Sequence, residues 1–234
     1  MSGASLTTAI LGTAMLWLVS AALALALAGL LAWGSTAPSR PVALGARAAV
    51  NVFRGIPTSL YVIAAGLLAL RLPGGAPPAL FPGTDRSFQI VALAICVALA
   101  LGSAGHLAAI FLAARRALGR PRIEAIRVLG LGAPARARVV AREAAPVALA
   151  PTGSRMVHHL HNTAFAGLFP VVEVYGHVDA EANATFRVGD AVLTGCLVYI
   201  ALSAVVWLGF RLAEQALTPA VSGPEPPRPW FSTS

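Results

Sequence analysis

Residues 9–33 read AILGTAMLWLVSAALALALAGLLAW, a stretch without a single charged or amide side chain. No charge occurs between Met1 and Ser39. A helix of about 20 apolar residues crosses the ~30 Å hydrocarbon core of a bilayer, whereas the apolar part of a cleaved signal peptide is only about 7–15 residues long. No convincing cleavage site follows, so we expect this segment to be retained as a transmembrane helix.

The rest of the chain has the same apolar character. Of its 234 residues, 57% are hydrophobic and 11% are charged, and the mean hydropathy is +0.76. These values predict an all-α membrane protein. Five apolar stretches predict transmembrane helices at about 9–33, 50–70, 88–114, 144–168 and 190–210. We expect one transmembrane domain over 1–217 and a disordered, proline-rich cytoplasmic tail over 218–234.

The second of these stretches is the weakest. Only sixteen uncharged residues separate Arg54 from Arg71, which is roughly 24 Å at helical rise. Both arginines must therefore extend along the helix to reach the membrane interfaces.

The charges of the chain predict its orientation. The net charge is +8 and all seventeen basic residues are arginine. Seven of them lie in 115–138, RRALGRPRIEAIRVLGLGAPARAR, beside one acid, Glu124, whereas 171–190 is net acidic. Arginines between apolar runs favour membrane orientation over nucleic-acid binding, and they place 115–138 in the cytoplasm. We therefore expect the N-terminus outside and the C-terminus in the cytoplasm. Without lysine the chain has no GxxxxGK[ST] phosphate loop.

The basic segment itself predicts a short helix over about 122–131. Gly130, Gly132 and then Pro134 should end it. Its apolar residues can cover one side, which leaves Glu124 and Arg127 on the other. Such a helix can dock into a partner protein or lie on anionic lipid headgroups, and periodicity alone leaves both open.

The residues of this helix resemble a known signature. EAIRVLGLG is similar to the loop of binding-protein-dependent ABC importer permeases, which reads Glu-Ala-Ala, three residues, then Gly. Glu124, Ala125 and Gly130 fall on this signature, and Ile126 replaces the second Ala.

Three further segments resemble the polar amino acid permeases within that family, in the same order along the chain. VFRGIPTSL is similar to their Phe-Arg-Gly-Thr-Pro segment at Arg54, Gly55 and Pro57. SAGHLAAIF is similar to their Ser-Ala-Ala-Tyr-Leu-Ala-Glu-Ile-Phe run, and HNTAFAGLFPVVEVYG to their Lys-Asp-Thr-Ser-Leu stretch. The resemblance covers about 9–214. The chain departs from it at Ala109, Arg142, Glu143, His161 and Asn162.

The resemblance implies the permease subunit of a type I ABC importer in the cytoplasmic membrane. The signature helix would be a coupling helix, with Glu124, Ala125, Arg127 and Gly130 engaging a separate ATPase dimer. It also implies a second permease copy or homologue, an extracytoplasmic solute-binding protein, and a polar amino acid or related small molecule as substrate. The chain would bind no cofactor, because its partner uses the ATP. Arg54, Gly55 and Pro57 would be a structural motif.

Polar residues within the fourth apolar stretch are candidates for the substrate path: Arg155, His158, His161, Asn162 and Thr163. An arginine in a span usually faces the bundle interior or a wet cavity. It could bind an anionic group, pair with an acid on another helix, or reach the interface. His158 and His161 share a helical face while His159 points elsewhere. No metal is expected, because no further ligand stands nearby in sequence.

Two acidic residues near the span ends have weaker assignments. For Glu143 we expect a solvated carboxylate at the membrane interface. Glu173 lies in the outward segment, where it could belong to an outer gate or a docking surface.

Two other functions remain open at this stage. GSAG at 102–105 and the histidines of the fourth span suggest an intramembrane hydrolase, although Ser103 stands one position too early for the Gly-x-Ser-Gly pattern of rhomboid-type proteases. An ATP-independent channel would need no ATPase and would make no use of Glu124.

Overall fold

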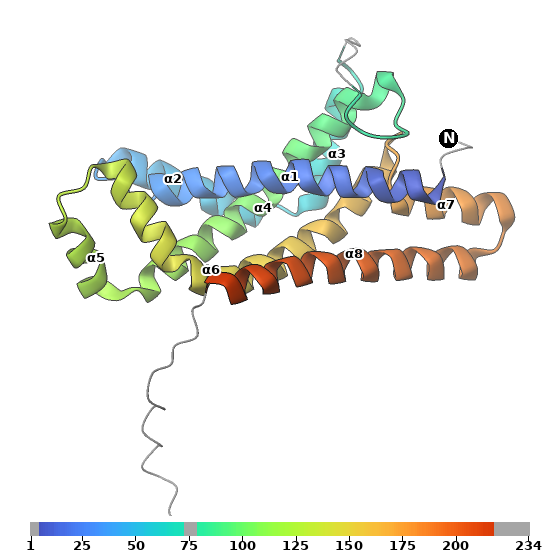
Figure 1. Ribbon diagram of the computed structural model, residues 1–234. Coiled ribbons are helices and arrows are strands. Elements are labelled where there is room, and N and C mark those ends of the chain that lie inside the picture. Colours follow the sequence, from blue (N-terminus) through green and yellow to red (C-terminus); the bar gives the residue numbers. More distant parts are fainter. Residues whose placement is uncertain (1–4, 73–78, 218–234) are drawn as a thin grey trace, which may run out of the picture.

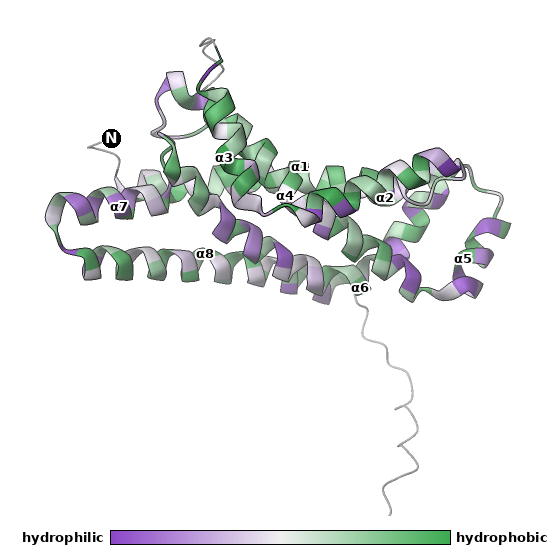
Figure 2. Cartoon of the chain, turned by 180° about the vertical axis from the view of Figure 1, so that it is seen from behind, coloured by the Kyte–Doolittle hydropathy of each residue, from purple (hydrophilic) through white to green (hydrophobic). Residues whose placement is uncertain are grey.

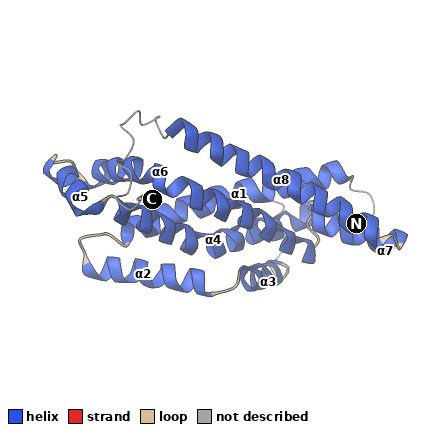
Figure 3. Cartoon of the chain, turned by 90° about the horizontal axis from the view of Figure 1, so that it is seen from below, coloured by secondary structure: helices blue, strands red, loops and turns tan. Residues whose placement is uncertain are grey.

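A computed structural model of the chain describes residues 5–72 and 79–217, and every regular element in these ranges is helical (Figure 3). The tail expected over 218–234 lies outside the described residues. In chain order the elements are α1 (Leu6–Gly34), α2 (Arg40–Gly55), α3 (Thr58–Ala69), η1 (Arg86–Phe88), α4 (Gln89–Ala117), α5 (Gly119–Val128), α6 (Ala133–Asn162), η2 (Thr163–Leu168), α7 (Val174–Thr185) and α8 (Val188–Leu217).

Helix α4 is the centre of the molecule. It packs against α1, α2, α3 and α6, whereas α8 packs against α6 and α7 (Figure 1). The most apolar segment of α4 has 67% of its residues buried inside the protein, whereas the most apolar segment of α8 has only 11%. Helix α8 is equally apolar, so its exposed surface belongs against lipid or another chain rather than water.

Small residues allow other helices to come close to α4. A Cβ atom at Gly105 would lie 2.7 Å from the backbone nitrogen of Arg54 and 2.8 Å from the carbonyl oxygen of Val50. Membrane helices pack through such small side chains, because lipid supplies no hydrophobic drive between them. The sequence repeats small residues at Gly105, Ala109, Ala113 and Ala117, but only its first part packs within this chain, since Ala113 and Ala117 are exposed.

The span expected at 50–70 is wrong as a single helix. Helices α2 and α3 are bent by 91° at a short break. Ile56 is extended there (φ −98°, ψ 129°), because the ring of Pro57 disfavours helical geometry at the residue before it. In the described residues, three helical segments are long and apolar enough to cross a membrane, Leu6–Gly34, Arg86–Ala117 and Val188–Leu217, or four if the broken pair is one span.

The fourth expected span, 144–168, also differs from the structure. Helix α6 begins eleven residues earlier than expected, at Ala133, and ends at Asn162, after which η2 continues to Leu168. Helix α6 is not among the described helices that are apolar enough to span by composition, since charged residues, histidines and two internal prolines interrupt its apolar run.

The short helix of the basic segment is present, with shifted ends. Helix α5 covers Gly119–Val128 instead of 122–131. Gly130 adopts a left-handed conformation (φ 65°), the usual glycine position just after a helix. Pro134 was expected to stop this helix, but it lies in the first turn of α6, where the missing N–H costs nothing.

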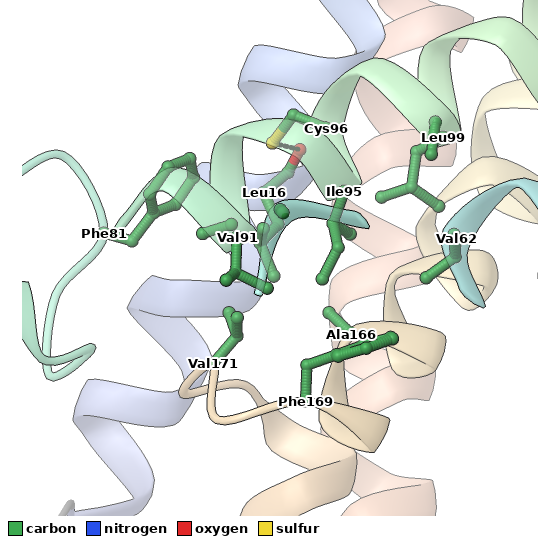
Figure 4. Close-up of a cluster of buried hydrophobic side chains, with 13 residues drawn as sticks. Leu16, Val62, Phe81, Val91, Ile95, Cys96, Leu99, Ala166, Phe169 and Val171 are labelled. Carbon is green, nitrogen blue, oxygen red and sulfur yellow. Dashed lines mark hydrogen bonds between the residues drawn. The ribbon is translucent and has the colours of Figure 1, made fainter. Parts of the chain in front are cut away.

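The end of the molecule away from α5 has its own apolar core. Phe81 and Val171 come from loops and pack with Leu16 of α1 and Val91 and Ile95 of α4 (Figure 4). Helix α1 comes especially close to the loop that contains Val171 and Val172. A Cβ atom at Gly12 would lie 2.1 Å from the carbonyl oxygen of Val172.

We expect Gly12→Ala to destabilise the protein by about 1–3 kcal/mol, since the added methyl must push α1 away from this loop. The measurement is the apparent melting temperature of the detergent-solubilised protein by circular dichroism. Gly29→Ala is the matched control in the same helix, because its Cβ would meet no atom within 4 Å; it should leave stability unchanged or raise it slightly. Equal melting temperatures for Gly12→Ala and the wild type would contradict the close approach.

Candidate functional site

Three elements meet at the middle of α4, around residues 102–106. They are α4 itself, the break between α2 and α3, and the C-terminal half of α6. Gly102 contacts Thr58 on one side of the break, and Gly105 contacts the backbone of Arg54 on the other. Figure 2 shows a hydrophilic stretch of α6 beside the largely apolar α4 and α8. Because α4 is one of the spanning helices, this polar region lies near the middle of the membrane.

Arg155 reaches this region from α6. One of its terminal nitrogens donates to the carbonyl oxygen of Gly102 at 3.0 Å and to Oγ of Ser103 at 3.3 Å. Its Nε atom is buried and has no hydrogen-bond partner among the described residues. None of the ion pairs formed among the described residues includes Arg155. The sequence left open that Arg155 pairs with an acidic residue on another helix. No such pair is found among the described residues.

A buried histidine extends the same hydrogen-bond chain. Oγ of Ser103 lies 2.7 Å from Nδ1 of His159, and Oγ of Ser20 lies 2.8 Å from Nε2. The Ser20 hydroxyl also donates to the carbonyl oxygen of Leu16 at 2.5 Å. With that hydrogen used, Nε2 must carry a proton and donate to Ser20, while Nδ1 accepts from Ser103. This assignment gives a neutral imidazole that links α1, α4 and α6.

Sequence reasoning missed the role of His159. It correctly placed His159 on a different face from His158 and His161, but it gave the residue no function. The available signal was the pair Ser20 and Ser103, polar residues inside two long uncharged runs, which need partners in an apolar interior.

The other two histidines lie on the exposed face of α6. His158 is exposed and lies close to Arg155. Nε2 of His161 lies 2.9 Å from Oγ of Ser203 on α8. His106 of α4 joins this group, since it lies close to Arg155, Arg54 and His158. The result is a face with two arginines and several histidines, and no ion pair among the described residues neutralises either arginine.

The remaining candidates of the substrate path lie elsewhere. Thr163 is buried, and its hydroxyl donates to the carbonyl oxygen of Leu160 at 2.7 Å. Asn162 is also buried, and within the described part of the chain its amide nitrogen has no hydrogen-bond partner. The structure therefore brings Arg155, His158 and His161 together and separates Asn162 and Thr163 from that exposed face.

The basic segment forms a second surface, at one end of the molecule. Glu124, Ala125 and Arg127 are exposed on α5. Of its apolar residues Ile126 is buried, but Val128 and Leu129 are 86% and 63% exposed. Of the apolar side chains expected to cover one side of this helix, Ile126 packs within the chain, whereas those at the C-terminal end of α5 face outward.

Two acidic residues differ from expectation. Glu143 is not simply solvated, because it accepts from Nε and a terminal nitrogen of Arg122 at 3.0 and 2.5 Å, a pair that joins α5 to α6. Glu173 is not on a docking surface, because it is fully buried.

Glu173 caps helix α7. Its carboxylate accepts hydrogen bonds from the backbone N–H groups of Tyr175 and Gly176 and from the Tyr199 hydroxyl. Burial raises the pKa of Glu173 to about 7, although these hydrogen bonds act to lower it. Through the hydrogen bonds to these backbone N–H groups, Glu173 fixes the residue at which α7 begins.

The Ser103–His159 pair bears on the hydrolase alternative. A serine hydroxyl 2.7 Å from an imidazole is the geometry of an activated nucleophile. Both residues are fully buried, however, and the second ring nitrogen faces Ser20 rather than a carboxylate. No substrate can reach this hydroxyl, so the pair does not favour a hydrolase.

Comparison with known proteins gives a clear result for the fold. No protein-family model matches the sequence, and no curated protein sequence matches it. A crystal structure of an amino acid ABC transporter with histidines is similar, with a TM-score of 0.72 and 18% identity, over 90% of this chain and 93% of that one. The methionine ABC transporter MetNI, in inward facing conformations, has a TM-score of 0.67 and 16% identity, over 92% of this chain and 94% of that one.

These likenesses cover almost the whole of each chain. The protein therefore has the fold of an ABC importer permease and is a multi-pass membrane protein. Identities below one fifth establish the fold, whereas the solute and partners depend on the residues of this chain.

We expect His159→Phe to destabilise the protein by about 2–3 kcal/mol, since it leaves the buried hydroxyls of Ser20 and Ser103 without their shared partner. The measurement is the apparent melting temperature in detergent. His158→Phe is the control, because His158 is exposed and forms no hydrogen bond with a described residue. Equal changes in both variants would contradict the buried chain of hydrogen bonds.

Proposed function

We propose that the chain is the membrane-embedded permease subunit of an ABC importer and that α5 couples it to a separate ATPase. The observation that carries this proposal is the exposed last turn of α5 at the arginine-rich end of a permease fold. Val128 and Leu129 offer apolar contacts there, and Glu124 and Arg127 offer charged ones. A rim of charge around an apolar contact is the usual anatomy of a protein interface.

The contacts of α5 suit it to transmit movement. The Arg122–Glu143 pair joins it to the N-terminal half of α6, and α6 continues to Arg155 and His159 in the middle of the molecule. A displacement of α5 by the ATPase would therefore be carried along one continuous helix to the polar region. ATP would be used by that partner, since this chain has no lysine and hence no phosphate loop.

The charge distribution supports an orientation. Helices α5 and α7 lie at opposite ends of the molecule (Figure 1). Seven arginines lie in 115–138 around α5, whereas α7 and its flanks carry Glu173, Asp179, Glu181 and Asp190. The α5 end would then be cytoplasmic, with the N-terminus outside and the C-terminus inside a cytoplasmic membrane.

The solute would pass along the exposed face formed by Arg54, His106, Arg155, His158 and His161. This face lies on the surface of one subunit, so a second permease copy or homologue would close the path around the solute. The motif residues Arg54, Gly55 and Pro57 form the break of α2 and α3 beside it. An extracytoplasmic binding protein would deliver the solute at the α7 end.

The cations of this face favour a solute that carries a carboxylate, such as a polar amino acid. A guanidinium binds a carboxylate through charge-assisted hydrogen bonds, and no ion pair among the described residues neutralises Arg155 or Arg54. His158 and His161 can add donors or acceptors on the same side.

Glu124→Arg should abolish co-purification of an ATPase subunit with the tagged permease, because it reverses the charge at the proposed contact. The measurement is mass spectrometry of proteins that are recovered in mild detergent from the native host. Glu181→Arg is the control, an exposed acid on α7 at the opposite end of the molecule. Recovery of the same ATPase with both variants would exclude Glu124 from the contact, and no ATPase with folded wild type would refute the proposed coupling.

Arg155→Gln should lower the uptake of the transported solute about 10-fold or more, which corresponds to the loss of one charge-assisted hydrogen bond. The measurement is uptake of a panel of radiolabelled polar amino acids by cells that carry each variant at equal abundance. Arg86→Gln, an exposed arginine on η1, should leave uptake unchanged. Unchanged uptake in Arg155→Gln would remove Arg155 from solute binding.

A further inference from the structure

A large cavity lies at the α5 end of the molecule, apart from the central polar face. Its volume is about 930 Å³, at the upper end of the ~300–1,000 Å³ range of small-molecule sites. Residues of α1, α4, α5, α6 and α8 form its walls. The larger apolar side chains among them include Leu25, Phe111, Leu112, Ile123, Leu149 and Phe210.

Four arginines line the same cavity: Arg115 at the end of α4, Arg127 of α5, and Arg136 and Arg138 of α6. No acidic side chain is among its described lining residues, and none of the ion pairs of the described chain includes these arginines. Arg115 and Arg127 both line the cavity and lie close enough for their like charges to repel. An anion bound there would relieve their repulsion.

The cavity also lies at the depth of the membrane interface. Trp33, in the last turn of α1, lines it and is 54% exposed. Tryptophan concentrates at the level of lipid headgroups, where an amphipathic ring is favoured. The arginines beside it are therefore at headgroup depth, while Leu25 and Phe111, further along α1 and α4, line the part that points into the bilayer.

We propose that this cavity binds one anionic phospholipid, with its phosphate on the arginines and an acyl chain along the apolar walls. Basic pockets between membrane helices on the cytoplasmic side bind acidic headgroups in this way. The site goes beyond the solute path, because none of its residues belongs to the central polar face. It shares Arg127 with the α5 surface of the proposed function, and the tests below therefore leave Arg127 unchanged.

Charge separates this occupant from a second copy of the chain. A copy in the same membrane orientation would bring the same arginine-rich end beside this one, and like charges would repel. An acidic lipid supplies both the anion and the apolar chain that the cavity lacks.

Native mass spectrometry of the full-length protein tests the proposal, with dioleoyl phosphatidylglycerol and dioleoyl phosphatidylcholine as the probes. The wild type should retain one phosphatidylglycerol per chain in preference to phosphatidylcholine. The double variant Arg136→Gln/Arg138→Gln should weaken phosphatidylglycerol binding about 30-fold, at roughly 1 kcal/mol for each arginine. Arg142→Gln, an exposed arginine of α6 that does not line the cavity, should bind as the wild type does.

A second variant tests the apolar part of the site. Gly29 lines the cavity, and a Cβ there would meet no atom within 4 Å. Gly29→Trp should therefore fill the space without disturbing the fold, which the melting temperature checks, and should abolish retention of the lipid. Equal retention of both lipids by the wild type, or unchanged retention in Gly29→Trp, would overturn the proposal. Loss of dimer mass in Gly29→Trp with lipid binding intact would assign the cavity to a second copy instead. ATPase co-purification is independent of all these results and reports on the proposed function alone.

Discussion

The close packing at one turn of α4, Gly102–Gly105, is the constraint on which the other elements depend. The missing side chain of Gly102 admits Thr58 of α3, and that of Gly105 admits the backbone of α2. Between them Ser103 points to α6 and holds His159 and Arg155. Because lipid gives helices no hydrophobic reason to associate, this short stretch fixes both the broken pair and α6 relative to the centre of the bundle.

The position of the cationic face follows from the same turn. An arginine at the centre of a bilayer costs at least about 2.5–3.5 kcal/mol. Gly102 offsets part of this cost with a carbonyl oxygen, and Ser103 with a hydroxyl that is already ordered by His159 and Ser20. The guanidinium is thereby held beside His106 and His158, and its buried Nε atom has no hydrogen-bond partner among the described residues.

The sequence predicted what depends on local composition, and it failed where a partner is distant. Long uncharged runs located α1, α4 and α8, and the glycine after a short amphipathic run located the end of α5 within three residues. The bend at Pro57 and the helix start at Pro134 could not be told apart, because proline suits both a break and a first turn. The partners of Glu143, His159 and Glu173 lie up to 139 residues away in the chain, and no local pattern specifies such pairings.

The break between α2 and α3 has a consequence for hydration. The last carbonyl groups of α2 have no partner within their helix, and residues 54–57 are exposed on this chain. They lie against the middle of α4, at a depth where hydrocarbon cannot satisfy a backbone carbonyl. Water or another protein surface must therefore reach the centre of the membrane at this point. The backbone itself creates that demand for water, and the surrounding side chains decide which solutes can replace it.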